Sequence, residues 1–554
     1  MSTAEPSSIA SLRVATFRRL WLALIVFNLG HLIQVVAASW LILELTSSPF
    51  WVSLAIAAPT LPLLFLSLPA GAAADLLDRR KILVASSALL ATASLGLAAL
   101  WSFDLITPTR LVALELAIGI GVAFFSPAWQ ANIPSLVPTN LVPGAVSLTS
   151  ASGGLATALG PALGGVLVAT IGPGWAFGAA AIGYSTLLIA AYASQDVEWN
   201  HERGSMAIAI ATGVRYLRFS RNYLWLLLVG SLFGFTSAAL RSMLPNITSD
   251  VLGGDSTLYG TLLGVFGMGA LLGGLTRSFA KRLFGQRVIP VGIILFGIFS
   301  LAVGISTLVW VTTIVITFCG LLWTWILSTL SSTFQMLTPD WVRGRTMSAF
   351  VLSVFGFLPL GAIAAGAIGE SFGADSSLVL FSLFTIAVGG IASWMPLPVL
   401  EQIDPPVVPE STADSLPEAE TAAKPVMVTN SWTIEEESFD AAVELLAELR
   451  LLRLSTGAYH WAAYRSAKDL TRVTEVFMLH SWDHHLQQHR RLDLEALEVI
   501  GRMEKSGVPG SLVRDHLVAF DVDHPSRRPA WQHFLAEHEQ MHLPHIESAG
   551  NQEA

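Results

Sequence analysis

Residues 71–81 read Gly-Ala-Ala-Ala-Asp-Leu-Leu-Asp-Arg-Arg-Lys, a short charged segment between two long apolar runs. Each run is long enough to cross the roughly 30 Å of hydrocarbon in a bilayer. The segment is therefore expected to connect two membrane-spanning helices. A small residue such as Gly71 lets neighbouring helices approach closely, and Arg79, Arg80 and Lys81 anchor the turn among lipid headgroups.

The composition excludes a water-soluble globular protein. Of the 554 residues, 53% are hydrophobic and only 13% are charged, and the mean hydropathy is +0.61. The net charge of −9 comes with a tail rich in Asp and Glu after Leu400, so it does not indicate nucleic-acid binding. The single cysteine, Cys319, lies in an apolar run, which excludes a disulfide framework and a thiolate metal site.

Twelve spans are expected, all of them helices because other backbone conformations leave polar groups unpaired in lipid. They lie at residues 18–43, 50–74, 82–102, 109–129, 146–170, 173–194, 223–245, 258–280, 288–307, 309–334, 346–370 and 375–398. Arginine and lysine gather in alternate loops, around Arg18, Arg79, Arg218, Lys281 and Arg343. By the positive-inside rule, both termini and the loop between the halves are cytoplasmic.

The spans divide into two related halves. Leu20-Trp21-Leu22 recurs as Leu224-Trp225-Leu226, and Pro138 has a counterpart in Pro339. Such internal repeats are typical of transporters in which one half rocks against the other around a midplane site. The expected domains are a six-helix half at 1–195, a cytoplasmic loop at 196–222, a second half at 223–400, a flexible linker at 401–425, a soluble cytoplasmic α+β domain at 426–545 and a disordered tail at 546–554.

The soluble domain is expected from a change of pattern after the proline-rich, acidic linker. Residues 426–434, 458–465 and 473–482 alternate like strands, and 441–454 form an amphipathic helix. A histidine- and arginine-rich helix follows. This order predicts a small α+β domain of the ferredoxin-like type.

Three motifs resemble those of the major facilitator superfamily. Residues 71–81 resemble its loop between helices 2 and 3, and Gly160-Pro161-Ala-Leu-Gly164-Gly165 resembles the antiporter signature of its exporters. The segments 125–129 and 339–345 are similar to the ends of helices 4 and 10 in its enterobactin-exporter-like branch, the transmembrane secretion effectors.

That resemblance implies a function. It implies an all-α membrane protein of twelve helices in two pseudo-repeats, with the small α+β domain as an extension that many members carry. It also implies a bacterial-type inner-membrane carrier, not an enzyme, that exports a small amphipathic drug- or siderophore-like molecule by alternating access coupled to proton antiport. The alternative is a membrane sensor or interaction protein whose C-terminal domain binds a ligand or partner.

The resemblance further assigns a latch between the halves to the first segment, comprising Gly71, Asp75, Asp78, Arg79 and Arg80. The family usually has Arg and Gly where this chain has Leu76 and Asp78, so a plain headgroup anchor remains the other interpretation. In the second half, Arg277 stands in place of Asp75. Gating is therefore expected to be asymmetric.

Polar groups inside spans are costly and mark functional sites. Asn28, His31 and Gln34 recur every three residues on one face, and together with Arg241 they are the expected substrate contacts. Glu115 and His31 are the candidate proton carriers, because burial favours the neutral form of a carboxyl group and histidine titrates near neutral pH. The open alternatives are a Glu115–Arg110 ion pair and a structural hydrogen bond for His31.

Four histidines in the tail, His480, His484, His485 and His489, include i, i+4 pairs that could share a metal. The intervening Gln and Arg residues favour a solvated helix face instead. No metal and no cofactor are expected. The expected partners are the lipid bilayer, the substrate and protons, with no nucleic acid, and the C-terminal domain offers a surface for self-association.

Overall fold

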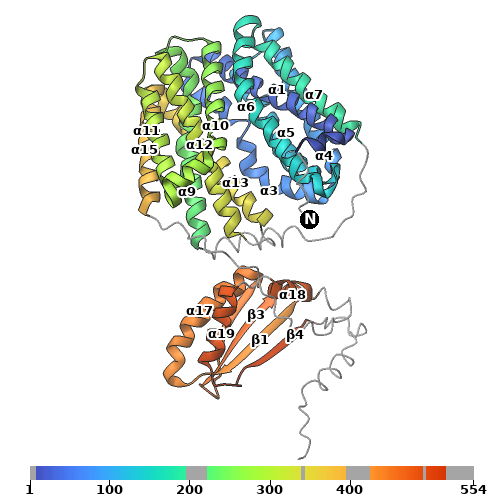
Figure 1. Ribbon diagram of the computed structural model, residues 1–554, viewed down its shortest axis with the longest axis vertical. Helices are drawn as coiled ribbons and strands as arrows, with labels where there is room; N and C mark the ends of the chain where they lie inside the picture. The colour runs from blue at the N-terminus through green and yellow to red at the C-terminus, as the bar shows by residue number, and fades with distance from the viewer. Residues whose placement is uncertain (1–7, 195–220, 339–342, 395–423, 491–493, 520–554) are drawn as a thin grey trace, which may run out of the picture. The chain divides into compact units, whose positions relative to one another are not determined.

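The computed structural model describes residues 8–194, 221–338, 343–394, 424–490 and 494–519. They form a helical bundle and a separate small domain (Figure 1). The linker at 401–425, the inter-half loop at 196–222 and the tail at 546–554 lie wholly or mostly outside the described residues.

The first half of the bundle is built from long apolar helices with ordinary start signals. Ser48, Asp78 and Thr107 cap the helices that follow them by accepting backbone N–H groups, and proline occupies the first turn where no N–H is needed. The helices are α1 (Ala15–Thr46), α2 (Pro49–Ala57), α3 (Leu61–Leu76), α4 (Arg79–Ser102), α5 (Pro108–Leu136), α6 (Val142–Ile171) and α7 (Pro173–Tyr192).

The second half repeats this arrangement. Figure 1 shows the first half in blue to cyan and the second in green to light orange. Its elements are α9 (Arg221–Asn246) with a π-helical turn at Ile247–Val251, α10 (Ser256–Phe284), α11 (Val288–Ile305), α12 (Val309–Leu337), α13 (Arg343–Phe355), α14 (Phe357–Phe372) and α15 (Ala374–Trp394). Twelve stretches in the described residues are long and apolar enough to span a membrane, as predicted.

Two spans are broken, contrary to the expectation of continuous helices at 50–74 and 346–370. The first is interrupted after Ala57, where Pro59 lacks an N–H and Pro62 restricts the residue before it. The second is interrupted at Gly356. The pieces α2 and α14 pack extensively on each other, whereas α3 and α13 touch much less. The breaks therefore allow the two ends of this helix pair to behave differently.

The halves meet closely where glycines remove side-chain bulk. A Cβ atom added at Gly165 of α6 would lie 2.4 Å from the carbonyl oxygen of Ser256 and 3.0 Å from Cα of Gly260 in α10. A Cβ at Gly366 of α14 would lie 2.5 Å from Cβ of Ser53 in α2. Both contacts lie toward the end of the bundle that holds Ser48, here called the Ser48 end. The bundle is closed between its halves at that end.

The C-terminal domain is a four-stranded antiparallel sheet with helices. Its strand order is β2-β3-β1-β4, so β1 is central, and Val426 pairs with both Leu479 and Val518. Buried Trp432, Leu446 and Met503 join the sheet to α17 and α19 in one core. The elements are β1 (Val426–Thr433), α17 (Phe439–Thr456), β2 (His460–Arg465), β3 (Arg472–Leu479), α18 (Trp482–Arg490), α19 (Leu494–Ser506) and β4 (Val513–Val518).

Candidate transport site

A buried polar cluster lies inside the first half. Glu115 of α5 is 1% exposed, and its Oε1 accepts a hydrogen bond of 3.2 Å from Nε2 of Gln34 in α1. The hydroxyl of Ser94 in α4 donates a hydrogen bond of 2.7 Å to Oε1 of Gln34. It also lies 2.9 Å from the carbonyl oxygen of Phe177 in α7. Arg110 instead donates to the carbonyl of Leu105, so the structure does not contain the Glu115–Arg110 pair. Four helices are thus linked through one chain of hydrogen bonds that ends at the Glu115 carboxyl group.

The expected substrate contacts on α1 separate into different environments. Gln34 is only 1% exposed and holds Glu115, so it does not line an open cavity in this conformation. Nδ1 of His31 lies 3.0 Å from Oη of buried Tyr184 in α7. The side-chain amide of Asn28 donates a hydrogen bond of 3.3 Å to Oγ of Ser152 in α6. A spacing of three residues placed these side chains near one face, but each has its own partner helix.

Arg241 of α9 has an unusual setting. Residues 236–240 and 242–248 are all buried, whereas Arg241 is exposed. Since twelve flanking residues cover every direction around a helix, the exposed part of Arg241 faces a space inside the bundle that water can reach, not lipid. Its charge acts on His31 in the first half and on Tyr259 of α10 in the second. Arg241 therefore lies where the two halves face each other.

An aromatic wall adjoins this position. Tyr259 is 1% exposed, and its ring stacks on Trp40 of α1 at a centroid distance of 6.0 Å. Because Trp40 and Tyr259 come from opposite halves, the wall exists only while the halves are together at this level.

The residues 71–81 form the turn between α3 and α4. Asp78 caps α4 by accepting the N–H of Arg80 at 2.9 Å. The guanidinium group of Arg79 donates a hydrogen bond of 2.6 Å to the carbonyl oxygen of Ala131 in α5. Arg80 donates hydrogen bonds to the carbonyl oxygens of Ala191 and Tyr192, the last residues of α7. Cations stabilise such helix ends because the last carbonyls lack partners within the helix.

An added Cβ at Gly71 would meet nothing within 4 Å, so the expected close helix approach is absent in this conformation. The side chain of Asp75 lies outside the described part of the chain, and the latch remains a prediction.

The glycines of the antiporter-like motif serve two interfaces. Added Cβ atoms at Gly160 and Gly164 would meet Leu32 and Ile33 of α1, whereas Gly165 faces α10 across the halves. Pro161 also contributes, because its carbonyl oxygen would lie 2.4 Å from a Cβ at Gly260. The motif therefore packs α6 against its own half and the opposite half together.

A contact between the halves at the Ser48 end was missed by sequence reasoning. Oε2 of Glu370 in α14 accepts a hydrogen bond of 2.6 Å from the hydroxyl of Ser48 and one of 3.3 Å from the N–H of Phe50, at the start of α2. A carboxylate at a helix N-terminus is stabilised by the helix dipole. Ser48-Pro49 is a recognisable helix start, but nothing in the sequence indicates its partner 322 positions away.

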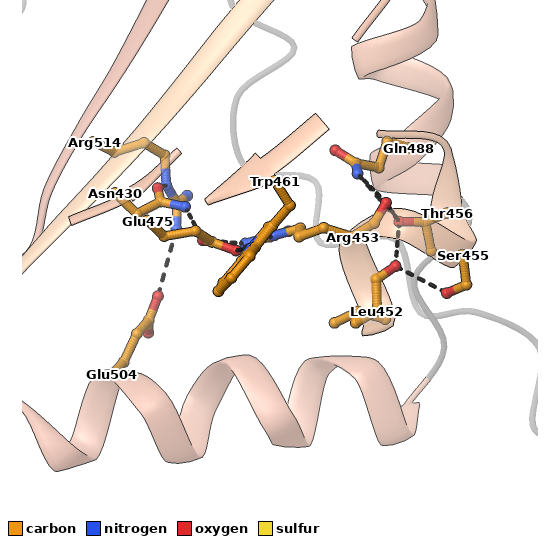
Figure 2. A network of polar contacts seen from close by, with 10 residues as sticks. All are labelled: Asn430, Leu452, Arg453, Ser455, Thr456, Trp461, Glu475, Gln488, Glu504 and Arg514. Carbon is orange, nitrogen blue, oxygen red and sulfur yellow. Dashed lines mark hydrogen bonds and ion pairs between the residues drawn. The ribbon is translucent and has the colours of Figure 1, made fainter. Parts of the chain in front are cut away.

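The C-terminal domain holds a buried ion pair. Figure 2 shows Glu475 of β3 between Arg453 of α17, Asn430 and Trp461. Nε of Arg453 lies 3.2 Å from Oε1 of Glu475, and Asn430 and Trp461 donate to the same carboxylate at 2.7 and 2.8 Å. Burial alone raises the pKa of Glu475, but Arg453 and these donors outweigh it, so the net pKa lies below its ordinary value.

The histidine helix is not the solvated surface that its composition indicated. His485 of α18 is 4% exposed and packs against Trp482, His489 and His516. Burial, reinforced by the neighbouring His489, His516 and arginines, holds the pKa of His485 far below its usual range. Among the described residues, no group of three His, Cys, Asp or Glu side chains is arranged to hold a metal.

Comparison with known proteins agrees with this architecture. Solved structures with the same fold include a bacterial homologue of the human lysosomal transporter Spinster in an inward-facing, unoccupied conformation. It aligns with a TM-score of 0.57 and 16% sequence identity, over 69% of this chain and 97% of that one. A D-xylose–proton symporter aligns with TM-score 0.53, 12% identity and coverage of 69% and 98%. Both likenesses concern the fold alone.

The sequence comparison narrows the class. The pattern of the transmembrane secretion effectors matches residues 6–514, and the chain belongs to this family of major facilitator transporters. A staphyloferrin A transporter of Staphylococcus aureus is 26% identical over 65% of this chain and 91% of its own length. The multidrug efflux pump Tap of Mycolicibacterium fortuitum is 26% identical over 66% and 92%. The chain is therefore a multi-pass membrane transporter and not an enzyme.

Proposed function

We propose that this protein exports a small amphipathic molecule, drug- or siderophore-like, by alternating access coupled to proton antiport. The relatives support this direction and cargo, since one is named as a siderophore transporter and another as a multidrug efflux pump. The closed Ser48 end and the inward-facing state of a structural neighbour support alternating access. In this proposal both termini are cytoplasmic and the Ser48 end is external, as the loop charges indicate.

The observation that carries the coupling is the setting of Glu115. Its carboxyl group is buried in a span and receives a hydrogen bond from a neutral amide, without a described cationic partner. An unpaired carboxylate is expensive in such a place, whereas the protonated form is tolerated. We infer that Glu115 takes up a proton while buried and releases it when the halves separate and water enters.

The experiment compares Glu115→Gln with a matched control in reconstituted vesicles. Asp104→Asn is the control, because Asp104 is exposed in the loop before α5 and its left-handed backbone, φ 53°, suits asparagine. Dye export is measured with and without an imposed pH gradient. Glu115→Gln should lose the stimulation by the gradient and keep passive exchange, while Asp104→Asn keeps both. Gradient stimulation equal to that of the wild type would remove Glu115 from the mechanism.

For the C-terminal domain we propose a cytoplasmic ferredoxin-like module that supports the transporter and associates with a second copy. The strand order β2-β3-β1-β4 is that of such a fold. The sheet also carries exposed apolar side chains, among them Tyr464, Val513 and Leu517. Expression of residues 1–400 alone tests the alternative of a membrane sensor: full export without the tail would favour a carrier with an accessory domain.

A further inference from the structure

We propose that Arg241 is the binding site for an acidic group on the exported molecule, so that the natural substrate is an amphipathic anion such as a carboxylic acid. This inference rests on the proposed export function and names the substrate class of that transport site. The guanidinium group of Arg241 lies between the two halves of the bundle and has no anionic partner among the described residues.

The first step concerns the partner of Arg241. Among the residues that the structure describes, none forms a hydrogen bond or an ion pair with its side chain. Glu115, the buried carboxyl group of the bundle, is instead engaged with Gln34. A charge within a membrane protein is normally paired or faces an aqueous cavity on a transport pathway. The exposure of Arg241 between buried neighbours is the second of these cases.

The second step concerns the groups around this cation. Arg241 acts on His31 across the halves and on Tyr259 in its own half. The stacked Trp40 and Tyr259 rings supply an apolar wall from both halves. A molecule with an acidic group beside a ring or aliphatic body matches a guanidinium next to an aromatic wall, since arginine binds carboxylates through two parallel hydrogen bonds.

The third step concerns what the anion would do to the carrier. A ligand that binds one arrangement of the carrier more tightly than the other stabilises that arrangement. Because His31 belongs to one half and Arg241 to the other, an acid bound between them contacts both. The anion is thereby positioned to influence the equilibrium between the closed and open arrangements of the Ser48 end.

The test uses two dyes that differ by one acidic group, rhodamine 110 and its methyl ester rhodamine 123. Export of each is measured in proteoliposomes for the wild type, Arg241→Gln and Arg241→Lys. The wild type should prefer the free acid, and Arg241→Gln should raise the KM for the acid by about tenfold or more, as expected for loss of a charge-assisted hydrogen bond. The KM for the ester should not rise, and Arg241→Lys should lie between the other two.

Thermal unfolding in detergent provides a second readout that a structural role would not give. Without dye, Arg241→Gln should unfold at about the same temperature as the wild type, because no described residue pairs with the Arg241 side chain. The free acid should stabilise the wild type and not the variant. A lower unfolding temperature for Arg241→Gln, or equal losses for both dyes, would overturn the anion site. A wild type that exports neither dye would overturn the export function together with it.

Discussion

Closure of the Ser48 end depends on the absence of a side chain at Gly165. A Cβ atom there would lie 2.4 Å from the carbonyl oxygen of Ser256, about 1 Å short of the 3.4 Å at which ordinary contact begins. The neighbouring atoms belong to the backbone of α10 and cannot rotate away. Gly165→Ala must therefore push α6 and α10 apart in the closed arrangement.

The size of the effect follows from the cost of overpacking. One methyl group forced into a close-packed interface costs about 1 to 3 kcal/mol. The cost applies only while α6 and α10 touch, so it shifts the equilibrium toward an open Ser48 end by roughly 5- to 150-fold. The matched control is Gly153→Ala on the same helix, because a Cβ at Gly153 would meet nothing within 4 Å.

The assay is labelling of a Ser53→Cys variant with a water-soluble maleimide in detergent. Ser53 is 0% exposed at the α2–α14 contact, so its label reports separation of the halves at this end. The native Cys319 is fully buried in α12 and supplies little background. Gly165→Ala should accelerate labelling at least fivefold over Gly153→Ala. Equal rates in the two variants would show that the glycine contact does not control closure.

Two further predictions concern the C-terminal domain of the full-length protein, and both are measured by hydrogen exchange in β1 and β3. Glu475→Gln leaves Arg453 buried without its carboxylate and should lower the free energy of local unfolding by about 3 to 5 kcal/mol. The control, Glu448→Gln, breaks an exposed ion pair and should lower it by under about 1 kcal/mol. Similar losses in the two variants would contradict the argument that the buried pair matters more. The pKa of His485 in the folded domain lies below its unfolded value of 6.5, so the unfolded state binds a proton that the folded state does not. The free energy of unfolding therefore keeps the full contribution of His485 above pH 6.5. As the pH falls below 6.5, it should decrease by up to about 1.4 kcal/mol per pH unit. His485→Phe should flatten that acid dependence after correction for intrinsic exchange rates, and an unchanged slope would assign it to other groups.

Much of the architecture is readable from one sequence. The twelve spans follow from apolar length, since the bilayer sets a minimum for every crossing helix. Three of the four strands of the C-terminal domain were predicted from alternation, as in β3, where every second residue is buried, whereas β4 was not predicted. The breaks in the second and eleventh spans were not predicted, although Pro59 and Gly356 stand at them. Proline and glycine occur so often in membrane helices that their presence alone does not identify a break.

The partners of the polar residues were decided by tertiary structure. Spacing along α1 placed Asn28, His31 and Gln34 near one face, but only packing determined that they meet α6, α7 and α5. The histidine-rich helix reads as solvated because its composition is polar, yet His485 is buried against a sheet that brings His516 beside it.

Residues 71–81 and the apolar runs beside them indicate a membrane protein, because apolar length and loop charge are written in consecutive residues. The transporter class came from the resemblance of this segment to a major facilitator loop. Where the halves touch, and that Arg241 lies between them without an ion-pair partner among the described residues, depends on helices far apart in the chain. A single helix exposes its side chains in all directions, and only the neighbours that assemble around it determine which of them find a partner.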